Sequence, residues 1–305
     1  MQDKWFVIVN PASGNGSAKK KWPLIQHELI VQNFQFEVAF TEYEKHSLLL
    51  IENALKQGFL KFICVGGDGT LHNIVNGILT INPANISVIK IGIIAIGTGN
   101  DWIKTYHITK NYKKAIQIIK TEHTIKQDIG KLTIGTENDI VYFNNLAGIG
   151  FDGYVVNKVN KYKNLGVLAY LIGALVSITS YKRSTLEINF NTTKLKGKTL
   201  MLLIGLCNYS GGGMQLTKNP NPTDGLFDIS FIQKITLFTL LGNIRGLFTG
   251  TITNHPLIKN YKTSELKIKV LNSHKTYIQA DGELIGTGNF KVSILPKKLQ
   301  FIVLK

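Results

Sequence analysis

FICVGGDGTLHNIVNGI, residues 62–78, is the stretch from which the fold of this chain can be worked out. It begins as a short apolar run typical of a buried strand, turns through Gly66, Gly67 and Gly69, and continues from Leu71 with apolar residues at helical spacing. Such a turn suits a phosphate group, because glycine lets the backbone approach a ligand and the first N–H groups of a helix lack partners. Asp68 places a carboxylate in the turn, within reach of Mg²⁺. A tight connection without any ligand explains one such turn equally well.

Two further turns have the same design. An apolar strand over residues 5–9 runs into NPASGNGS (residues 10–17), and a strand over residues 91–96 runs into GTGNDW (residues 97–102). Neither turn has the Gly-Lys-Ser/Thr spacing of a Walker A loop or the Gly-x-Gly-x-x-Gly spacing of a Rossmann fingerprint. Three turns of this kind favour a ligand site much more strongly than one.

Strands and helices alternate over the first 125 residues or so, with a further strand over residues 36–41 and helices over 18–31, 46–57 and 112–120. This alternation predicts an α/β domain with a doubly wound parallel sheet. Because the carboxyl ends of parallel strands share one edge of a sheet, the three glycine turns are expected to lie together where such sheets bind ligands.

The pattern changes after residue 127. Short strand-like segments dominate, and two helical stretches, 166–181 and 237–249, interrupt them. The expected strands cover residues 129–134, 140–146, 186–190, 200–207, 227–232, 266–270, 277–280, 290–295 and 301–304. We therefore expect three segments: a nucleotide-binding α/β domain (1–127), a β-rich, sandwich-like second domain (128–295), and a terminal strand (296–305) that returns to the first domain.

The composition narrows the class of protein. A net charge of +16 favours an anionic partner, but the basic residues are dispersed and no recognition helix is present, so a nucleic acid is not expected. Cys64 and Cys207 lie among apolar residues, as free thiols in a reducing compartment do. Residues 5–9 are too short for a signal peptide and the apolar run 166–179 is too short to cross a bilayer. These features predict a cytoplasmic protein that associates peripherally with membranes.

Seven motifs in this order resemble the bacterial diacylglycerol kinase-like lipid kinases, a group that includes the catalytic domains of sphingosine and ceramide kinases. They are NPASG (10–14), Thr41, GGDGT (66–70), GTGND (97–101), NLAGIGFD (145–152), DGLFD (224–228) and DGE (281–283). The Gly-Gly-Asp-Gly motif alone is shared with NAD kinases and phosphofructokinases. The resemblance implies an NAD kinase/phosphofructokinase-like first domain that binds ATP and a second domain that binds the lipid.

The implied reaction is transfer of the γ-phosphate of ATP, with Mg²⁺, to the hydroxyl of diacylglycerol or a related lipid alcohol. Phosphoryl transfer depends mostly on positioning and charge neutralisation, which backbone donors, a metal and a base can supply. The nucleotide site implied by the family consists of Asn10, Pro11, Ala12, Ser13, Gly14, Thr41, Gly66, Gly67, Asp68, Gly69, Thr70, Leu71, His72, Asn73 and Thr98.

Three acidic residues match catalytic positions of the family. Glu283 matches the general base, which would accept the proton of the attacking hydroxyl. On local sequence alone, an Asp-Gly hairpin turn at residues 281–282 competes with this role. Asp68 and Asp101 match residues that organise Mg²⁺ near the phosphates, although Asp101 is equally suited to cap a helix that begins at Trp102.

The resemblance also implies a structural magnesium site. Asp224 would supply a carboxylate, and Asn221 and Leu226 would supply backbone carbonyls, which suit a hard cation. Asp128 matches a further member of the magnesium network near the phosphates. Turns without an ion explain the Asp224 loop and Asp128 as well.

Two positions depart from the family pattern. Asn73 stands where Glu is common, which removes a charge beside the phosphate-binding helix, and Trp102 stands where Phe is usual. Two other functions stay open. One is an NAD kinase-like kinase of a soluble alcohol, which shares the Gly-Gly-Asp-Gly turn, and the other is a catalytically silent nucleotide or lipid sensor, which Asn73 keeps open. For a lipid kinase, the expected partner is a lipid substrate at an anionic membrane surface, approached through Lys158, Lys161 and Lys163. Two apolar stretches, 165–173 and 237–241, offer faces to a membrane or an acyl chain, although packing in the core is the favoured interpretation for most of these residues. The sequence leaves a possible homodimer open.

Overall fold

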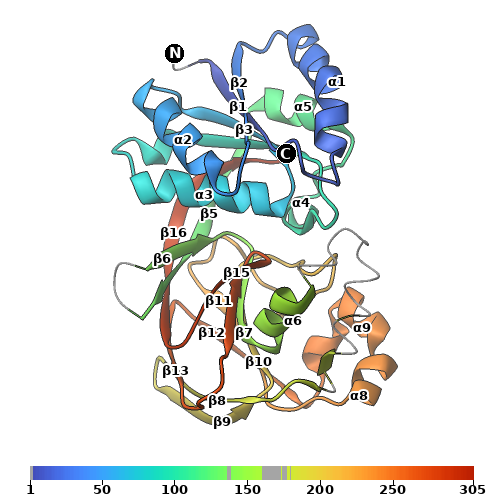
Figure 1. Cartoon of the computed structure of the whole chain (residues 1–305), viewed down its shortest axis with the longest axis vertical. Coiled ribbons are helices and arrows are strands. Elements are labelled where there is room, and N and C mark those ends of the chain that lie inside the picture. The colour runs from blue at the N-terminus through green and yellow to red at the C-terminus, as the bar shows by residue number, and fades with distance from the viewer. Residues whose placement is uncertain (1–2, 136–138, 160–172, 174–176, 179) are drawn as a thin grey trace. The chain divides into compact units, whose positions relative to one another are not determined.

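The computed structural model describes residues 3–135, 139–159, 173, 177–178 and 180–305. It divides the chain into two compact units (Figure 1): unit 1 comprises residues 1–127 and 297–305, and unit 2 comprises residues 128–296. Lys161, Lys163 and most of the helix expected over residues 166–181 lie outside the described residues. In the part of the chain that is described, no helix is long and apolar enough to cross a membrane.

Unit 1 contains a sheet of order β2-β1-β3-β4-β16. Its strands are β1 (Trp5–Val9), β2 (Phe36–Phe40), β3 (Lys61–Gly66), β4 (Lys90–Ala95) and the last residues of β16 (Phe290–Ile302), and every pairing in it is parallel. Its helices are α1 (Ser17–Val31), α2 (His46–Lys56), α3 (Asp68–Ile81), η1 (Ile86–Val88), α4 (Asp101–Thr105) and α5 (Tyr112–Thr121).

Helices cover both faces of this sheet, as Figure 1 shows, and all residues of the interior strand β1 are therefore buried. Val7 and Val9 pack in one cluster with apolar residues of α1 and α5. On the other face Phe6 contacts Phe59 and Phe62, with ring centroids 5.2 and 6.3 Å away. The predicted doubly wound α/β architecture is confirmed.

Unit 2 is built from two sheets. The first has the order β12-β11-β10-β7-β14-β15, and all of its pairings are antiparallel. The second contains β16, β13, β8 and β9, with β5 joined to β16 and β6 joined to β5. The bounds are β5 (Thr124–Ile134), β6 (Ile140–Phe143), β7 (Leu146–Gly150), β8 (Ser184–Phe190), β9 (Thr193–Thr199), β10 (Met201–Gly205), β11 (Phe227–Ile232), β12 (Ile258–Thr263), β13 (Glu265–Val270), β14 (Tyr277–Ala280) and β15 (Glu283–Thr287).

Aromatic rings join the two sheets of unit 2. Phe143 of β6 stacks on Phe227 of β11 at 5.7 Å, and Phe190 of β8 meets Tyr261 of β12 at 5.2 Å. The predicted β-rich, sandwich-like architecture is thereby confirmed. The described helices of unit 2 include α6 (Phe151–Val159), α8 (Leu237–Gly242), α9 (Ile244–Thr249) and η3 (Thr251–Asn254).

Several predicted elements differ from the structure. The single helix expected over residues 237–249 is wrong, because the chain breaks at Asn243 into α8 and α9. The strand expected over residues 140–146 ends at Phe143, and the two strands expected over 290–295 and 301–304 form one continuous strand, β16. Four strands went unpredicted: β7, β9, β12 and β15. All except β7 lie at the edge of a sheet, where a strand needs fewer apolar residues.

Candidate functional site

The strands of unit 1 bring four predicted loops to one edge of the sheet. Because β2, β1, β3 and β4 are parallel neighbours, the residues that follow them lie at the same carboxyl edge. Backbone hydrogen bonds extend this order into the loops: Thr41 N donates to Val9 O, and Asn10 N donates to Val65 O. Ile96 N likewise donates to Gly66 O at 2.7 Å. The segments around residues 10, 41, 66 and 97 therefore lie side by side.

Thr70 connects the loop after β1 to helix α3. Its hydroxyl accepts a hydrogen bond from Asn10 Nδ2 at 3.1 Å and lies 3.4 Å from Ser13 Oγ. Asn10 Oδ1 in turn accepts from Ala12 N at 3.1 Å, which closes the loop on itself. A Cβ atom on Gly66 would lie 2.4 Å from Thr70 Oγ1, so this arrangement requires glycine at position 66. The loop and the first turn of α3 form one polar, preorganised surface.

The loops after β3 and β4 approach each other backbone to backbone. A Cβ atom on Gly97 would lie 2.8 Å from the Cα of Gly67, closer than backbone atoms allow. Asn100, in the left-handed conformation with φ 49°, donates from Nδ2 to Gly97 O at 2.7 Å. Its buried Oδ1 has no hydrogen-bond partner among the described residues. A buried acceptor in this state is unfavourable unless a ligand or water satisfies it.

Asp68 holds helix α4 in place. Its carboxylate accepts hydrogen bonds from Asp101 N at 3.0 Å and from Trp102 N at 3.2 Å, the first two amides of that helix. Helical N-termini favour such negative charges. The interpretation of Asp101 as the capping residue is wrong, since Asp101 is the first residue of α4 and Asp68 supplies the acceptor.

Asp68 and Asp101 fit a magnesium ion. A Cβ atom on Gly99 would lie 3.2 Å from Asp68 Oδ2 and 3.5 Å from Asp101 Oδ2, so two carboxylate oxygens converge on space that glycine leaves free. Carboxylate oxygens are the ligands that Mg²⁺ prefers. Lys104, whose Nζ lies 2.6 Å from Asp101 Oδ1, balances one of the two charges. Sequence reasoning missed Lys104, although its spacing of three residues from Asp101 on a helix is a usable signal.

The remaining residues of the expected nucleotide site differ in accessibility. Ala12 and Thr98 are exposed, and Asn73 on α3 is half-buried. The side chains of Leu71 and His72 are buried within unit 1, and His72 O accepts a hydrogen bond from Asn76 Nδ2 at 2.8 Å. Leu71 therefore serves the core of unit 1.

In unit 2, Glu283 follows a tight hairpin turn. Asp281 and Gly282 connect β14 to β15 with φ angles of 52° and 82°, and Ala280 pairs with Glu283 across the turn. Two central residues with positive φ define the type I′ turn that Asp-Gly favours. The hairpin interpretation of residues 281–282 is therefore confirmed. It is compatible with a chemical role for Glu283, because the turn fixes this half-buried residue at the start of β15.

Two carboxylates anchor this hairpin, Asp281 directly and Asp152 through the side chain of Gln279. Asp281 accepts hydrogen bonds from the backbone N–H groups of Asn144, Asn145 and Leu146, at 3.1, 2.9 and 3.2 Å. Buried Gln279 accepts from Gly282 N at 2.9 Å and donates to Asp152 Oδ2 on α6. The turn before Glu283 is thus fixed to the β6–β7 connection and to the first turn of α6. No spacing in the sequence identifies Gln279.

Burial raises the pKa of Asp152 to about 6, and the hydrogen bond from Gln279 offsets part of this rise. In the unfolded chain the Asp152 carboxyl releases its proton at about pH 4. Folding therefore takes up a proton between about pH 4 and about pH 6. We expect Asp152→Asn, which cannot titrate, to become more stable relative to the wild type as the pH rises through this window. Urea unfolding at several pH values would measure the difference, with exposed Asp139→Asn as control. A pH-independent difference would contradict the expectation.

A hydrogen bond within the Asp224 loop and an ion pair with Lys262 of β12 hold this loop in place. Leu226 N donates to Asp224 Oδ1 at 3.0 Å, and Lys262 Nζ lies 3.1 Å from Asp224 Oδ2 and 3.3 Å from Asp228 Oδ2. Burial raises the pKa of Asp228 to about 6, and Lys262 offsets part of this rise. Asn221 Oδ1 accepts from Thr223 N at 3.1 Å.

The magnesium site expected from Asn221, Asp224 and Leu226 stays a prediction. An ammonium group compensates Asp224, the single carboxylate of that set, so a metal would have to displace Lys262. Buried Asp128 anchors the same loop, since its Oδ2 accepts from Gly225 N at 2.7 Å and its N donates to Pro222 O at 2.8 Å. Sequence reasoning missed Lys262 of β12, which pairs with Asp224 in the loop before β11.

We expect Lys262→Gln to make the Asp224 loop dependent on magnesium. In chelator the variant should melt a few degrees below the wild type, because Asp224 and Asp228 lose about 1 kcal/mol of ion pairing at a half-exposed lysine. Added Mg²⁺ should restore the melting temperature of the variant and leave the wild type unchanged. Lys259→Gln, exposed on the same strand, is the matched control. A wild type that gains as much from Mg²⁺ would show that the metal displaces Lys262.

The chain thus combines an α/β unit, whose glycine loops share one sheet edge, with a β-sandwich unit. Residues 4–132 match the diacylglycerol kinase catalytic domain, and residues 145–303 match the YegS C-terminal NAD kinase beta sandwich-like domain. The chain belongs to the diacylglycerol kinase-like family.

Individual relatives agree with this assignment. The chain is 30% identical over 282 residues to a diacylglycerol kinase of Staphylococcus haemolyticus, covering 92% of this chain and 82% of the relative. It is 29% identical to a diacylglycerol kinase of Staphylococcus aureus, covering 94% and 88%. A crystal structure of a diacylglycerol kinase from Bacillus anthracis has the same fold, with a TM-score of 0.72, 19% identity and coverage of 99% and 97%.

Proposed function

We propose that this protein is an ATP-dependent lipid kinase that transfers the γ-phosphate of ATP to the hydroxyl of diacylglycerol or a related lipid alcohol. The observation that carries the proposal is the group of loops at the carboxyl edge of the unit 1 sheet, with Asp68 and Asp101 converging beside Gly99. The names of the relatives supply the class of substrate.

In this proposal the phosphates of ATP bind to the first turn of α3 and to the loop after β1. The backbone N–H groups at the start of α3 and the amide of Asn10 are suitable donors, and Gly66 and Gly67 allow close approach. Pro11, Ser13, Gly14, Thr41, Gly69 and Thr98 complete the proposed nucleotide site, together with Ala12, Thr70 and Asn73.

Asp68 and Asp101 would hold Mg²⁺, which neutralises developing charge on the phosphates when it is bound. Asp68 is already oriented by its hydrogen bonds to the first amides of α4. The glycine at position 99 leaves space beside both carboxylates. Asn221, Asp224, Leu226 and Asp128 shape the loop before β11, and the Lys262→Gln experiment tests the magnesium site expected there.

Glu283 would act as the general base. As the lipid oxygen forms its bond to the γ-phosphorus, its proton passes to the Glu283 carboxylate, and the bond between the γ-phosphorus and the bridging oxygen of ADP breaks. The proposal requires the hairpin of unit 2 to reach the γ-phosphate in the reacting complex. The anchors at Asp281 and Gln279 would limit the freedom of that hairpin.

A kinase assay with labelled ATP, Mg²⁺ and mixed micelles of candidate lipids tests this function. We expect label in the phosphate of one or more lipid alcohols and no label in a control without lipid. Parallel samples contain NAD without detergent, and ATP binding is measured separately. Labelled NAD would favour the kinase of a soluble alcohol. Tight ATP binding without transfer to any lipid would favour the silent sensor and overturn the proposal.

A further inference from the structure

We infer that helices α8 and α9 form a docking surface that inserts into an anionic lipid bilayer. This docking surface consists of Phe238, Leu241, Ile244 and Phe248, which are 85%, 47%, 38% and 38% exposed. The inference rests on the proposed function for its purpose, since a lipid substrate with long chains lies in a bilayer. It concerns a surface of unit 2 remote in sequence from every residue assigned to the phosphoryl-transfer site.

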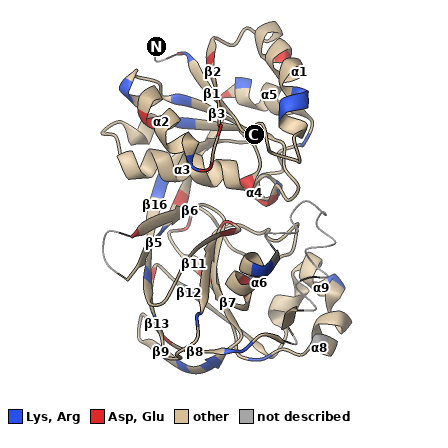
Figure 2. Cartoon of the chain, viewed as in Figure 1, with Lys and Arg blue, Asp and Glu red and all other residues tan. Residues whose placement is uncertain are grey.

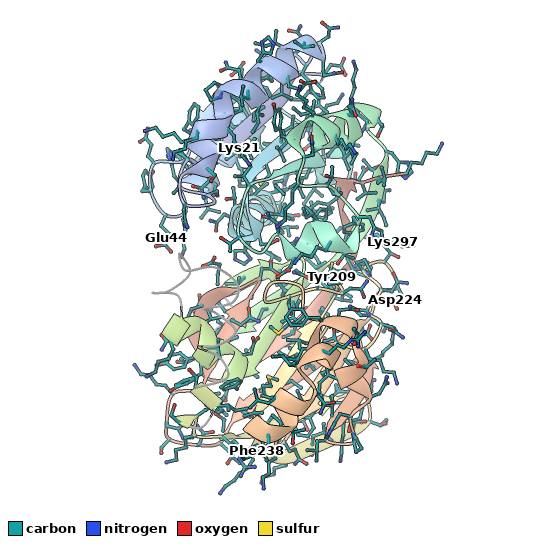
Figure 3. The ribbon with its side chains drawn as sticks, turned by 90° about the vertical axis from the view of Figure 1, so that its right-hand side faces the viewer. Lys21, Glu44, Tyr209, Asp224, Phe238 and Lys297 are labelled. Carbon is teal, nitrogen blue, oxygen red and sulfur yellow. The ribbon has the colours of Figure 1, made fainter. Side chains whose placement is uncertain are left out.

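Phe238 and Leu241 are three residues apart on α8, and Ile244 and Phe248 are four residues apart on α9, so each pair lies on one side of its own helix. The opposite side is packed: Leu247 is 6% exposed and belongs to a cluster with Phe151, Val155 and Ile235, against which Leu240 also packs. Leu240 and Leu247 therefore supply the contacts of this segment with the core of unit 2, and the exposed apolar residues are not needed there. In Figure 3, labelled Phe238 lies at the surface of unit 2.

Hydrogen bonds hold the docking surface in shape. Thr236 caps α8 by accepting from Thr239 N at 3.1 Å, and Asn243 Nδ2 donates to Thr239 O at 2.9 Å. At the other end, Gln215 Nε2 donates to Phe248 O at 2.8 Å. The exposed apolar residues therefore sit on a supported segment, and a rigid surface loses little conformational entropy on binding.

The positive charge near the docking surface favours an anionic bilayer as its occupant. From residue 229 to residue 264 the sequence contains no Asp or Glu, and Figure 2 accordingly shows no acidic residue on α8 or α9. Exposed Arg245 lies on α9, and exposed Lys234 lies just before α8. Arg183 joins them, because its Nη1 donates to Gln233 O at 3.4 Å. Apolar side chains bordered by these cations match a bilayer with anionic head groups.

The first test uses vesicles of phosphatidylcholine with about 30% phosphatidylglycerol, which is enough anionic lipid to give a negative surface potential. We expect Phe238→Ser with Phe248→Ser to weaken vesicle binding at least about 10-fold, since two aromatic anchors are lost. Leu24→Ser with Ile30→Ser, at apolar positions of α1 that are 56% and 57% exposed, is the matched control and should bind as the wild type does. Equal binding by the docking-surface variant and the wild type would overturn the inference.

A second variant gives a readout that does not depend on loss of binding. The three native tryptophans, Trp5, Trp22 and Trp102, are 4%, 7% and 1% exposed, so their emission should change little on docking. In Phe238→Trp we expect a blue shift on adding these vesicles and quenching by brominated acyl chains. No shift would overturn the inference, as would a concentration-dependent shift without vesicles, which would indicate a second copy as the occupant. Neither measurement needs ATP, so membrane docking and kinase activity can fail separately.

Discussion

Glu283→Gln is expected to lower the rate of lipid phosphorylation by about 10²–10⁴-fold, the range typical of a lost general base. The substitution keeps the size of the side chain and removes only its ability to accept a proton. Since Glu283 begins β15 directly after the type I′ turn, the hairpin itself should persist. The measurement is the turnover number in mixed micelles, together with the dissociation constant of ATP, which should stay within about 2-fold because nucleotide binding is assigned to unit 1.

Glu265→Gln is the matched control for this experiment. Glu265 also lies in unit 2 at the start of a strand, where it pairs with Lys291 at 3.0 Å, and nearly half of its side chain is exposed. We expect its activity to equal that of the wild type. If Glu283→Gln kept wild-type turnover, another group would have to accept the proton, and the role proposed for this hairpin would be wrong.

Asp281→Ala is expected to give the largest loss of stability in unit 2, about 3 kcal/mol or more, because three backbone N–H groups lose a charged acceptor. Alanine is also strained at a φ of 52°. Hydrogen exchange should show faster exchange at Asn144, Asn145 and Leu146, which would locate the loss at the anchor.

Asp281→Asn separates charge from geometry. Asparagine tolerates the left-handed conformation and keeps one acceptor oxygen, so we expect less than half of the destabilisation caused by alanine. Exposed Asp139→Ala is the control for loss of an acidic side chain in the same unit. Unchanged exchange at the three amides in Asp281→Ala would show that water replaces the carboxylate without cost.

The sequence predicts unit 1 well because its signals are local. Apolar strands followed by glycine turns specify parallel βα units, and Gly66 or Gly97 can be recognised without knowing what it touches. The predicted nucleotide loops share one sheet edge for the same reason. Local reasoning failed where an edge strand such as β9, with lysines at alternate positions, has little apolar content to detect.

Side-chain roles that depend on distant partners also could not be predicted. Asp68 caps a helix that begins 33 residues later, and Lys262 reaches Asp224 across 38 residues. Gln279 connects two segments separated by 127 residues. The spacing of these residues does not predict that they interact, because the fold, and not the local sequence, brings them together.

The end of β16 has a consequence for biosynthesis. Phe301 and Ile302 belong to the core of unit 1, where the Phe301 ring lies 4.9 Å from that of Trp102 and Phe301 pairs with Ile91 of β4. These residues leave the ribosome only after all of unit 2 has been synthesised. Unit 1 therefore cannot complete its sheet until unit 2 has been synthesised, and β4 keeps an unpaired edge until the end of β16 emerges.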